Sequence, residues 1–216
     1  MKCRKQSLKK FYKKSFDLKV FQGLEDKTYE RIKFINKYSK EIDSLSETII
    51  TKDDERYIYK QVFTHKKDFH KFPKNVIKKH LEKLAKDLDK LSQLGFIHGD
   101  LNKKNILFDG VKFIVIDLEP CLEQVINGKK KLMFTIPYWS LNDMRNNKIT
   151  TETDKIGFYS FCKWAFDKTL TITNTLEKFR NRQKSNFELF SINETDIINL
   201  SFTKILSLFK FNNGVL

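Results

Sequence analysis

The sequence predicts an α+β protein with a small β-rich N-terminal part and a mainly helical C-terminal part. Three observations lead to this fold class. Two pairs of short apolar runs, one over residues 46–63 and one over 106–116, each flank a turn, as in β-hairpins. Between them, apolar residues recur at intervals of three and four from 75 to 94, which is the period of a helix. A further helical pattern begins near residue 150.

Composition limits the classes of protein and partner. A chain of 216 residues can bury a good core as one domain or as two small lobes. The 42 Lys and Arg residues exceed the 27 Asp and Glu residues, which gives a net charge of +15. Such a surface suits a nucleotide, a phosphorylated glycan, a membrane surface or a nucleic acid. The bias of an AT-rich genome toward Lys, Asn, Ile and Phe explains the excess at least as well.

The cellular compartment follows from what the sequence lacks. Cys3, Cys121 and Cys162 are few and far apart, which argues against a disulfide framework or a zinc site and favours a reducing compartment. No apolar run approaches the length of about 18 residues that a membrane-spanning helix needs. We expect a cytoplasmic protein, with peripheral contact to the inner face of an anionic membrane left open.

The N-terminal elements are predicted in the following order. The basic residues 1–14 form one strand or a solvated arm, and Phe16–Phe21 forms a short strand. A helix follows from about Asp26 to Tyr38, and the hairpin pairs Ser46–Thr51 with Arg56–Phe63.

The central elements surround a polar loop. A long amphipathic helix from Asn75 to Leu94 ends at Gly95. After the loop, the runs Ile106–Phe108 and Phe113–Ile116 flank the turn Asp109-Gly110 and predict a tight hairpin.

Acidic and amide side chains lie at the ends of this hairpin. Asp100 and Asn105 come before it and Asp117 follows it, so we expect the hairpin to bring them together at one end. Two oxygen ligands and one further carboxylate suit Mg²⁺ carrying a nucleotide phosphate, with the third group facing an acceptor hydroxyl. A hairpin with merely solvated polar ends is the structural alternative.

The C-terminal part is predicted to be helical. A helix with a capped start covers Thr150 to Phe166, and Ile197–Phe211 suits one packed helix. The last segment forms part of the core in the simpler interpretation and a basic amphipathic membrane helix in the alternative one.

The central loop resembles a known family. HGDLNKKN at 98–105 is similar to the catalytic loop of the protein-kinase-like superfamily, and IDLE at 116–119 stands where such kinases carry their metal-binding Asp. The resemblance implies that Asp100 orients or deprotonates the acceptor hydroxyl and that Asn105 and Asp117 hold Mg²⁺. It also implies a two-lobed fold, with a small β-rich N-lobe over about 1–64 and a mainly helical C-lobe over about 65–216.

The same resemblance implies the nucleotide contacts. Lys19 stands in the strand that resembles the one whose lysine grips the α- and β-phosphates, and Glu30 is placed to pair with it. Lys9 and Glu25 are the rival lysine and acid. Backbone groups near Val62, Phe63 and Thr64 would meet the adenine edge.

Two later motifs extend the resemblance. Thr135–Ser140, TIPYWS, resembles the segment that shapes the acceptor platform of protein kinases. Asp154 resembles the helix aspartate that accepts hydrogen bonds from the backbone of the catalytic loop.

The chain departs from the protein-kinase pattern in five places. It has no glycine-rich loop before Lys19, and Gly99 replaces the Arg of His-Arg-Asp. Asn102 stands where protein kinases usually place a lysine, and Lys103 or Lys104 is the candidate to take over that role. Leu118-Glu119 replaces Phe-Gly, which makes Glu119 a further candidate metal contact. Leu141-Asn142-Asp143 replaces Ala-Pro-Glu, so that the usual buried Glu–Arg anchor is lost or altered.

These residues predict an ATP- and Mg²⁺-dependent phosphotransferase that acts on a hydroxyl, with a protein Ser/Thr acceptor as the leading expectation and a glycan as the alternative. TIPYWS and Asp154 favour a protein Ser/Thr acceptor, whereas HGD and IDLE favour a sugar of a lipopolysaccharide core, as in the small-molecule and glycan kinases. The missing glycine-rich loop leaves open a pseudokinase that binds partners without catalysis. A nucleic-acid partner rests on charge alone and is not favoured.

Overall fold

The computed structural model contains two compact units. It describes residues 10–17, 25–45, 48–52, 56–63, 66–117, 123–126, 129–132, 139–166 and 194–209. The first unit comprises Met1–Phe69 and Leu107–Pro120, and the second comprises His70–Ile106 and Cys121–Leu216. Strands dominate the first and helices the second, so the α+β class is confirmed.

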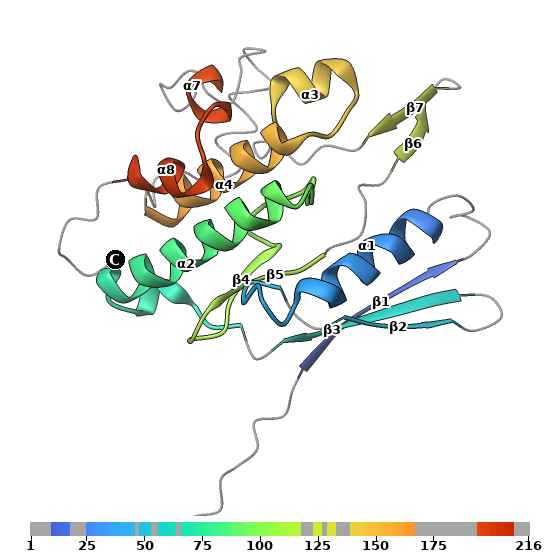
Figure 1. Cartoon of the computed structure of the whole chain (residues 1–216), viewed down its shortest axis with the longest axis horizontal. Coiled ribbons are helices and arrows are strands. Elements are labelled where there is room, and N and C mark those ends of the chain that lie inside the picture. Colours follow the sequence, from blue (N-terminus) through green and yellow to red (C-terminus); the bar gives the residue numbers. More distant parts are fainter. Residues whose placement is uncertain are drawn as a thin grey trace, which may run out of the picture. The chain divides into compact units, whose positions relative to one another are not determined.

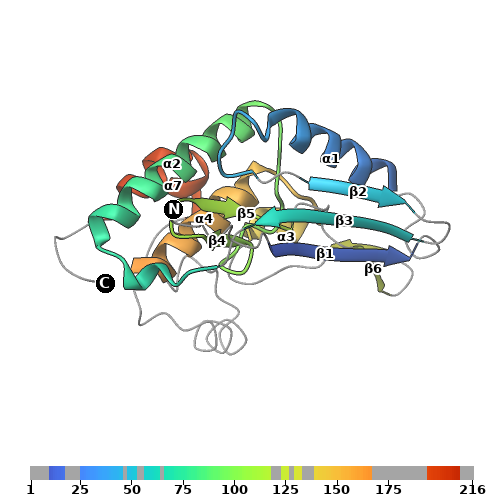
Figure 2. The same cartoon turned by 90° about the horizontal axis from the view of Figure 1, so that it is seen from below.

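The N-terminal segment of the first unit contains a three-stranded antiparallel sheet and one helix. The strand order of this sheet is β1-β3-β2, with β1 at Lys10–Asp17, β3 at Arg56–Phe63 and β2 at Thr48–Lys52. The predicted hairpin is therefore confirmed. Helix α1, Glu25–Tyr38, lies beside β2, as Figures 1 and 2 show.

The first strand begins within the basic N-terminal segment. β1 starts at Lys10, in the segment that was expected to form one strand or a solvated arm, and runs to Asp17. Of the strand expected at Phe16–Phe21, residues 18–21 lie outside the described residues. Strand β1 pairs with the whole length of β3, from Lys10 opposite Phe63 to Asp17 opposite Arg56. The extent of a strand depends on its partner as much as on its own apolar content, and the lysines of β1 gave no sign of that partner.

The second predicted hairpin is also present. Strands β4, Ile106–Phe108, and β5, Phe113–Val115, form a two-stranded sheet. The carboxylate of Asp109 closes the turn, because its Oδ1 accepts hydrogen bonds from the backbone N–H groups of residues 111 and 112, both at 2.8 Å. Gly110 takes a φ of 97° there, a conformation that favours glycine.

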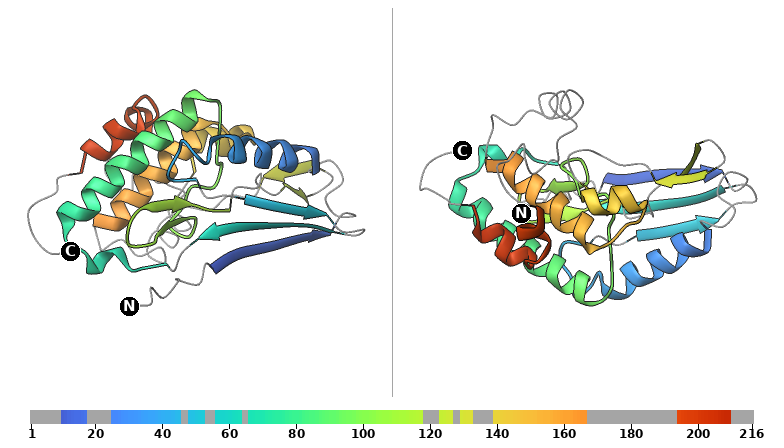
Figure 3. Two further views of the ribbon diagram at one scale, coloured as in Figure 1. Left: turned by 60° about the horizontal axis from the view of Figure 1, so that its bottom comes forward. Right: turned by 90° about the horizontal axis from the view of Figure 1, so that it is seen from above.

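The second unit is built on helices, which Figure 3 shows from two further directions. Its elements are α2 (Lys74–Gln93), β6 (Glu123–Ile126), β7 (Lys129–Leu132), α3 (Leu141–Asn146), α4 (Thr151–Phe166), α7 (Glu194–Ile198) and α8 (Phe202–Ser207). Helix α2 packs against α8, and α4 packs against α7 and α8. A short 3-10 turn, η1 (Phe69–Lys71), lies at the boundary between the units.

The C-terminal helix corrects a prediction. Ile197–Phe211 was expected to form one helix, but α7 ends at Ile198 and α8 starts anew at Phe202. The side chain of Ser201 caps α8, and the Asp89 carboxylate on α2 accepts hydrogen bonds from Phe202 N at 2.7 Å and Thr203 N at 3.2 Å. These contacts satisfy N–H groups at a helix start and explain why the chain begins a new helix there.

None of the helices in the described part of the chain combines the length and the apolar content required to cross a membrane.

Candidate active site

The loop 98–105 is fixed by its own hydrogen bonds. It follows α2 after Gly95, which takes a φ of 77°, and it leads directly into β4. Asp100 N donates to His98 Nδ1 at 3.1 Å, and Lys104 N donates to Asn102 Oδ1 at 2.8 Å. Because Nδ1 of His98 accepts, a neutral His98 carries its proton on Nε2.

Asn105 holds Asp100 through its amide nitrogen. Asn105 Nδ2 donates to the carbonyl oxygen of Asp100 at 2.8 Å and to its carboxylate Oδ2 at 3.0 Å. Both partners are oxygen acceptors, so the NH₂ end of the amide must face Asp100. Oδ1 of Asn105 is thereby directed away from Asp100, and within the described residues it accepts no hydrogen bond. An amide oxygen in this orientation suits a hard cation such as Mg²⁺.

Asp154 on α4 binds the start of the loop. One carboxylate oxygen accepts from His98 N at 2.6 Å and the other from Gly99 N at 2.7 Å. Asp154 is buried, and hydrogen bonds to an ionised acceptor in such surroundings are short and strong. The predicted contact between Asp154 and the loop backbone is confirmed. Gly99 has a φ of 84° at this point, which explains glycine in place of arginine.

Gly157 is a residue of the site that the sequence interpretation missed. A Cβ atom at this position would overlap the carbonyl oxygen of Leu101 and lie 3.2 Å from its carbonyl carbon. Asp154 and Gly157 are three residues apart, so they share one face of α4. Asp154 accepts hydrogen bonds from the backbone of the loop, and Gly157 leaves room for that backbone. The available signal was a glycine inside a helical pattern, which often marks a close approach.

We expect Gly157→Ala to destabilise the protein. In an unhindered helix this change adds about 1 kcal/mol of stability, because alanine has the higher helix propensity. Here the new methyl group meets backbone, and we expect a loss of about 1–3 kcal/mol of unfolding free energy. Urea denaturation measures the change, with Lys163→Ala on the same helix as the control. A more stable Gly157→Ala protein would contradict the close contact.

A buried carboxylate fixes the chain just before α4. Asp143 is fully buried and accepts hydrogen bonds from Thr150 N at 2.8 Å, Thr150 Oγ1 at 2.9 Å and Thr153 Oγ1 at 2.6 Å. The anchor expected to be lost or altered at 141–143 is therefore altered: threonine groups, rather than an arginine, satisfy the acid. The Asp143 carboxylate therefore joins α3 to α4, the helix that carries Asp154.

Cys162 and Glu194, two of the described groups with perturbed pKa values, lie outside the loop. Burial raises the pKa of the Cys162 thiol well above its usual value, which keeps this thiol protonated and unreactive. Burial also raises the pKa of the Glu194 carboxyl, although hydrogen bonds from Ser140 and Leu141 act in the opposite direction. Neither Cys162 nor Glu194 takes part in the hydrogen bonds that fix the loop 98–105, and we assign no chemical role to either residue.

Asp117 belongs to the first unit, whereas Asp100 and Asn105 belong to the second. It follows β5 and takes a φ of 62°, which is the left-handed region that non-glycine residues rarely enter. Such a conformation costs of the order of 1–3 kcal/mol and is found preferentially at functional sites. The backbone at Asp117 is thus consistent with a functional position.

The remaining predicted residues are divided between described and undescribed parts. Lys19, Thr64 and Glu119 lie outside the described residues, as do 135–138 of the TIPYWS motif. Val62 lies on β3 opposite Phe11. Glu30 is exposed on α1, and its carboxylate is 4.0 Å from the ammonium of Lys33. The pairing of Glu30 with Lys19 stays a prediction.

Comparison with known proteins supports the kinase interpretation. Residues 48–133 match the model of the lipopolysaccharide kinase (Kdo/WaaP) family, which is less than half of the chain. No curated protein gives a match. The family is part of the protein-kinase-like superfamily and its members are ATP-dependent kinases. The match therefore confirms the resemblance of the chain to that superfamily and identifies it as an ATP-dependent phosphotransferase.

The match also bears on the acceptor. It covers β2, β3, α2, the loop 98–105 and the hairpin that follows. It gives no support to the protein Ser/Thr acceptor that was the leading expectation from the sequence. Helix α4, with Asp154 and Gly157, lies beyond the matched residues, so its role rests on the contacts described above.

Proposed function

We propose that the chain is a sugar kinase that transfers the γ-phosphoryl group of ATP to a hydroxyl of a lipopolysaccharide-type glycan. The pair formed by Asp100 and Asn105 is the observation that carries this proposal. Both residues lie within the segment that matches the lipopolysaccharide kinase family. A carboxylate held by an amide whose oxygen is left for a cation suits phosphoryl transfer to a hydroxyl, as in the catalytic loop of kinases.

The proposed chemistry assigns one task to each residue of the loop. Asp100 orients the acceptor hydroxyl and accepts its proton as the oxygen attacks the γ-phosphorus. Asn105 fixes the Asp100 carboxylate through Nδ2 and offers Oδ1 to the metal, and Asp117 offers a second oxygen ligand. Bound Mg²⁺ would neutralise charge on the phosphates. Positioning and charge stabilisation supply most of the acceleration in such reactions.

One lysine of the loop is the better candidate for a phosphate contact. The ammonium of Lys103 lies 5.1 Å from the centroid of the Trp164 ring on α4, a distance typical of a cation–π interaction. Lys104 is exposed. We therefore assign the role of the missing protein-kinase lysine to Lys104 rather than to Lys103.

The nucleotide would be held by groups of the N-terminal part. We propose that Lys19, paired with Glu30, contacts the α- and β-phosphates and that backbone groups near Val62 and Thr64 meet the adenine edge. In this proposal the chain is one kinase-like domain with an N-lobe at about 1–64 and a C-lobe at about 65–216.

The acceptor follows from the loop motif and the family. HGD and IDLE occur in glycan and small-molecule kinases, in agreement with the matched family. Because a lipopolysaccharide precursor is an amphiphile, a kinase that modifies its core works beside a membrane. We propose a cytoplasmic protein that meets the inner face of that membrane.

A labelling experiment tests the acceptor. The wild-type chain is incubated with γ-labelled ATP and Mg²⁺ and is offered a lipopolysaccharide extract, a generic basic protein, or no acceptor but itself. We expect label in the sugar fraction of the extract. Label only in protein would favour a protein kinase, and ATP binding without transfer to any acceptor would favour the pseudokinase.

A further inference from the structure

Asn102 connects two parts of the loop that carries Asp100. Its Nδ2 donates to the carbonyl oxygen of Asp100 at 3.2 Å, and its Oδ1 accepts from Lys104 N at 2.8 Å. Its own carbonyl oxygen accepts from Asn105 N at 3.0 Å and from Ile106 N at 3.1 Å. The Asn102 side chain therefore joins the backbone two positions before it to the backbone two positions after it.

The two partners of the Asn102 side chain require an amide. A carbonyl oxygen only accepts and a backbone N–H only donates, so the NH₂ group faces Asp100 and the oxygen faces Lys104. A lysine, which only donates, could not accept from Lys104 N, and an ionised aspartate could not donate to Asp100. Asn102 is buried, so water cannot easily replace a partner that is lost.

Two amides meet at the carbonyl oxygen of Asp100. Asn105 Nδ2 donates to this oxygen at 2.8 Å and Asn102 Nδ2 at 3.2 Å. A carbonyl oxygen has two lone pairs, so both donors can bind at once. Asn105 also binds the carboxylate of Asp100 directly, whereas Asn102 acts on the backbone that bears this carboxylate. The reacting group is thus fixed through both its side chain and its main chain.

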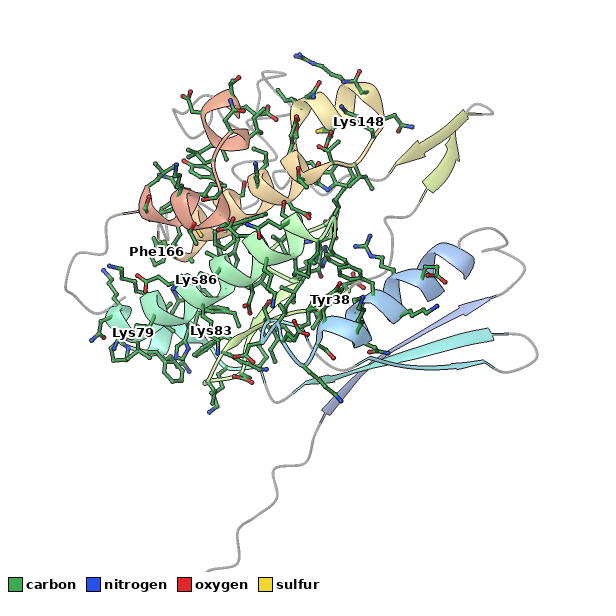
Figure 4. All side chains as sticks on the ribbon, viewed as in Figure 1. Tyr38, Lys79, Lys83, Lys86, Lys148 and Phe166 are labelled. Carbon is green, nitrogen blue, oxygen red and sulfur yellow. The ribbon has the colours of Figure 1, made fainter. Side chains whose placement is uncertain are left out.

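The other end of the Asn102 amide fixes the backbone of Lys104. Figure 4 labels exposed lysines on α2, among them Lys83 and Lys86, whose backbone is fixed by the helix itself. Lys104 is also exposed but lies in a loop, where the hydrogen bond to Asn102 Oδ1 takes the place of a helical one. A fixed main chain reduces the entropy that the lysine side chain loses when its ammonium meets an anion.

We propose that Asn102 is a positioning residue of the transfer reaction, which holds the backbone of Asp100 and the backbone of Lys104 at a fixed separation. One side chain thereby sets the carboxylate that takes the proton relative to the ammonium that contacts the phosphate. The inference rests on the proposed function, because the roles of Asp100 and Lys104 are the ones given there. Displacement of a reacting group by about 1 Å costs about 10² in rate, so the loss of Asn102 should be measurable.

A double-mutant cycle between Asn102 and Lys104 tests the proposal. Asn102→Ala, Lys104→Ala and the double variant are compared with the wild type as full chains, with labelled ATP, Mg²⁺ and the lipopolysaccharide extract as acceptor. Lys104→Ala keeps the backbone N–H that binds Asn102, so it removes only the ammonium. We expect each single change to lower kcat by about 10- to 100-fold, and the double variant to lie within about twofold of the slower single variant.

A residue that only stabilises the fold gives a different result. Its effect would be independent of the Lys104 ammonium, and the two losses would multiply in the double variant. Multiplied losses would overturn the proposal, and so would a wild-type kcat in Asn102→Ala or in Lys104→Ala. Circular dichroism verifies folding, and Asn102→Ser, whose side chain is too short to reach both partners, replaces Asn102→Ala in the cycle if the alanine variant does not fold.

Two control variants match the changes in kind. Asn199→Ala removes another asparagine amide, which donates to the carbonyl oxygen of Thr195 at 3.0 Å on α7. Lys86→Ala removes an exposed ammonium from α2. Both should keep the wild-type kcat, and Lys86→Ala should add nothing to the loss caused by Asn102→Ala.

The pH dependence of kcat gives an independent measurement. Asn102→Asp keeps an oxygen for Lys104 N but places a negative charge beside Asp100. Like charges disfavour the ionised form of a carboxyl group, so the acid limb of the profile should move to higher pH. Asn102→Ala adds no charge and should lower the plateau with the limb in place. An acid limb that stays in place in Asn102→Asp would contradict the contact with Asp100.

The wild type separates this inference from the proposed function. If the wild type transfers label to the sugar fraction and the Asn102 variants do so equally fast, the positioning role is wrong and the proposed function stands. If the wild type transfers label to no acceptor, the proposed function is wrong, and the role of Asn102 is wrong with it.

Discussion

Replacement of Asp100 by alanine should lower the rate of phosphoryl transfer by about 10²- to 10⁴-fold, the range typical of a general base. The variant loses the carboxylate that we propose faces the acceptor hydroxyl, and Asn105 Nδ2 keeps only the carbonyl oxygen of residue 100 as its partner in the loop. The nucleotide Kd should change little, because Asp100 is not proposed to bind ATP. Transfer at saturating ATP, followed with labelled nucleotide, measures the effect.

The control for Asp100 is another aspartate of the same region. Asp109 closes the turn of the β4–β5 hairpin and carries no proposed chemistry. Asp109→Asn keeps an oxygen acceptor for that turn and should retain most of the transfer rate. Equal rates for wild type and Asp100→Ala would remove Asp100 from the reaction.

Replacement of Asp154 by alanine should reduce both stability and transfer. The change leaves the buried N–H groups of His98 and Gly99 without their acceptor, at a cost of about 1–3 kcal/mol for each group. The loop that carries Asp100 then loses these two hydrogen bonds to α4, so we expect transfer by the remaining folded protein to fall by about 10² as the reacting group is displaced. Urea denaturation measures the first effect and a transfer assay below the unfolding midpoint the second.

Two further variants make the Asp154 result interpretable. Asp154→Asn keeps one oxygen acceptor and should give intermediate values of both quantities. Asp196→Ala on α7 removes an exposed carboxylate and should change neither. If Asp154→Ala lowered stability but left the transfer rate of the folded protein intact, Asp154 would be a structural residue only.

The parts of the fold that could be predicted depend on local signals. Apolar period and turn residues predicted the β2–β3 and β4–β5 hairpins, and Gly95 marked the end of α2. The loop 98–105 could be interpreted because its motif resembles a known catalytic loop, and the hydrogen bond between the side chains of Asp100 and Asn105 joins residues only five positions apart.

The parts that could not be predicted depend on distant partners. The interruption between α7 and α8 is fixed in part by Asp89, which lies 113 residues before Phe202. The register of strand β1 depends on β3, and the need for glycine at 157 arises from Leu101. None of these partners leaves a trace in the local sequence, whereas Asp154 could be assigned because a family resemblance supplied the long-range contact.

The most direct test of the proposed chemistry is the labelling experiment with the lipopolysaccharide extract, run with Mg²⁺ and again with the metal removed by a chelator. We predict transfer of label to the sugar fraction with Mg²⁺, its loss with the chelator and its return when Mg²⁺ is restored. Transfer that ignores the metal would contradict the roles of Asn105 and Asp117. No transfer under any condition, with ATP bound, would contradict the assignment of the chain as a phosphotransferase.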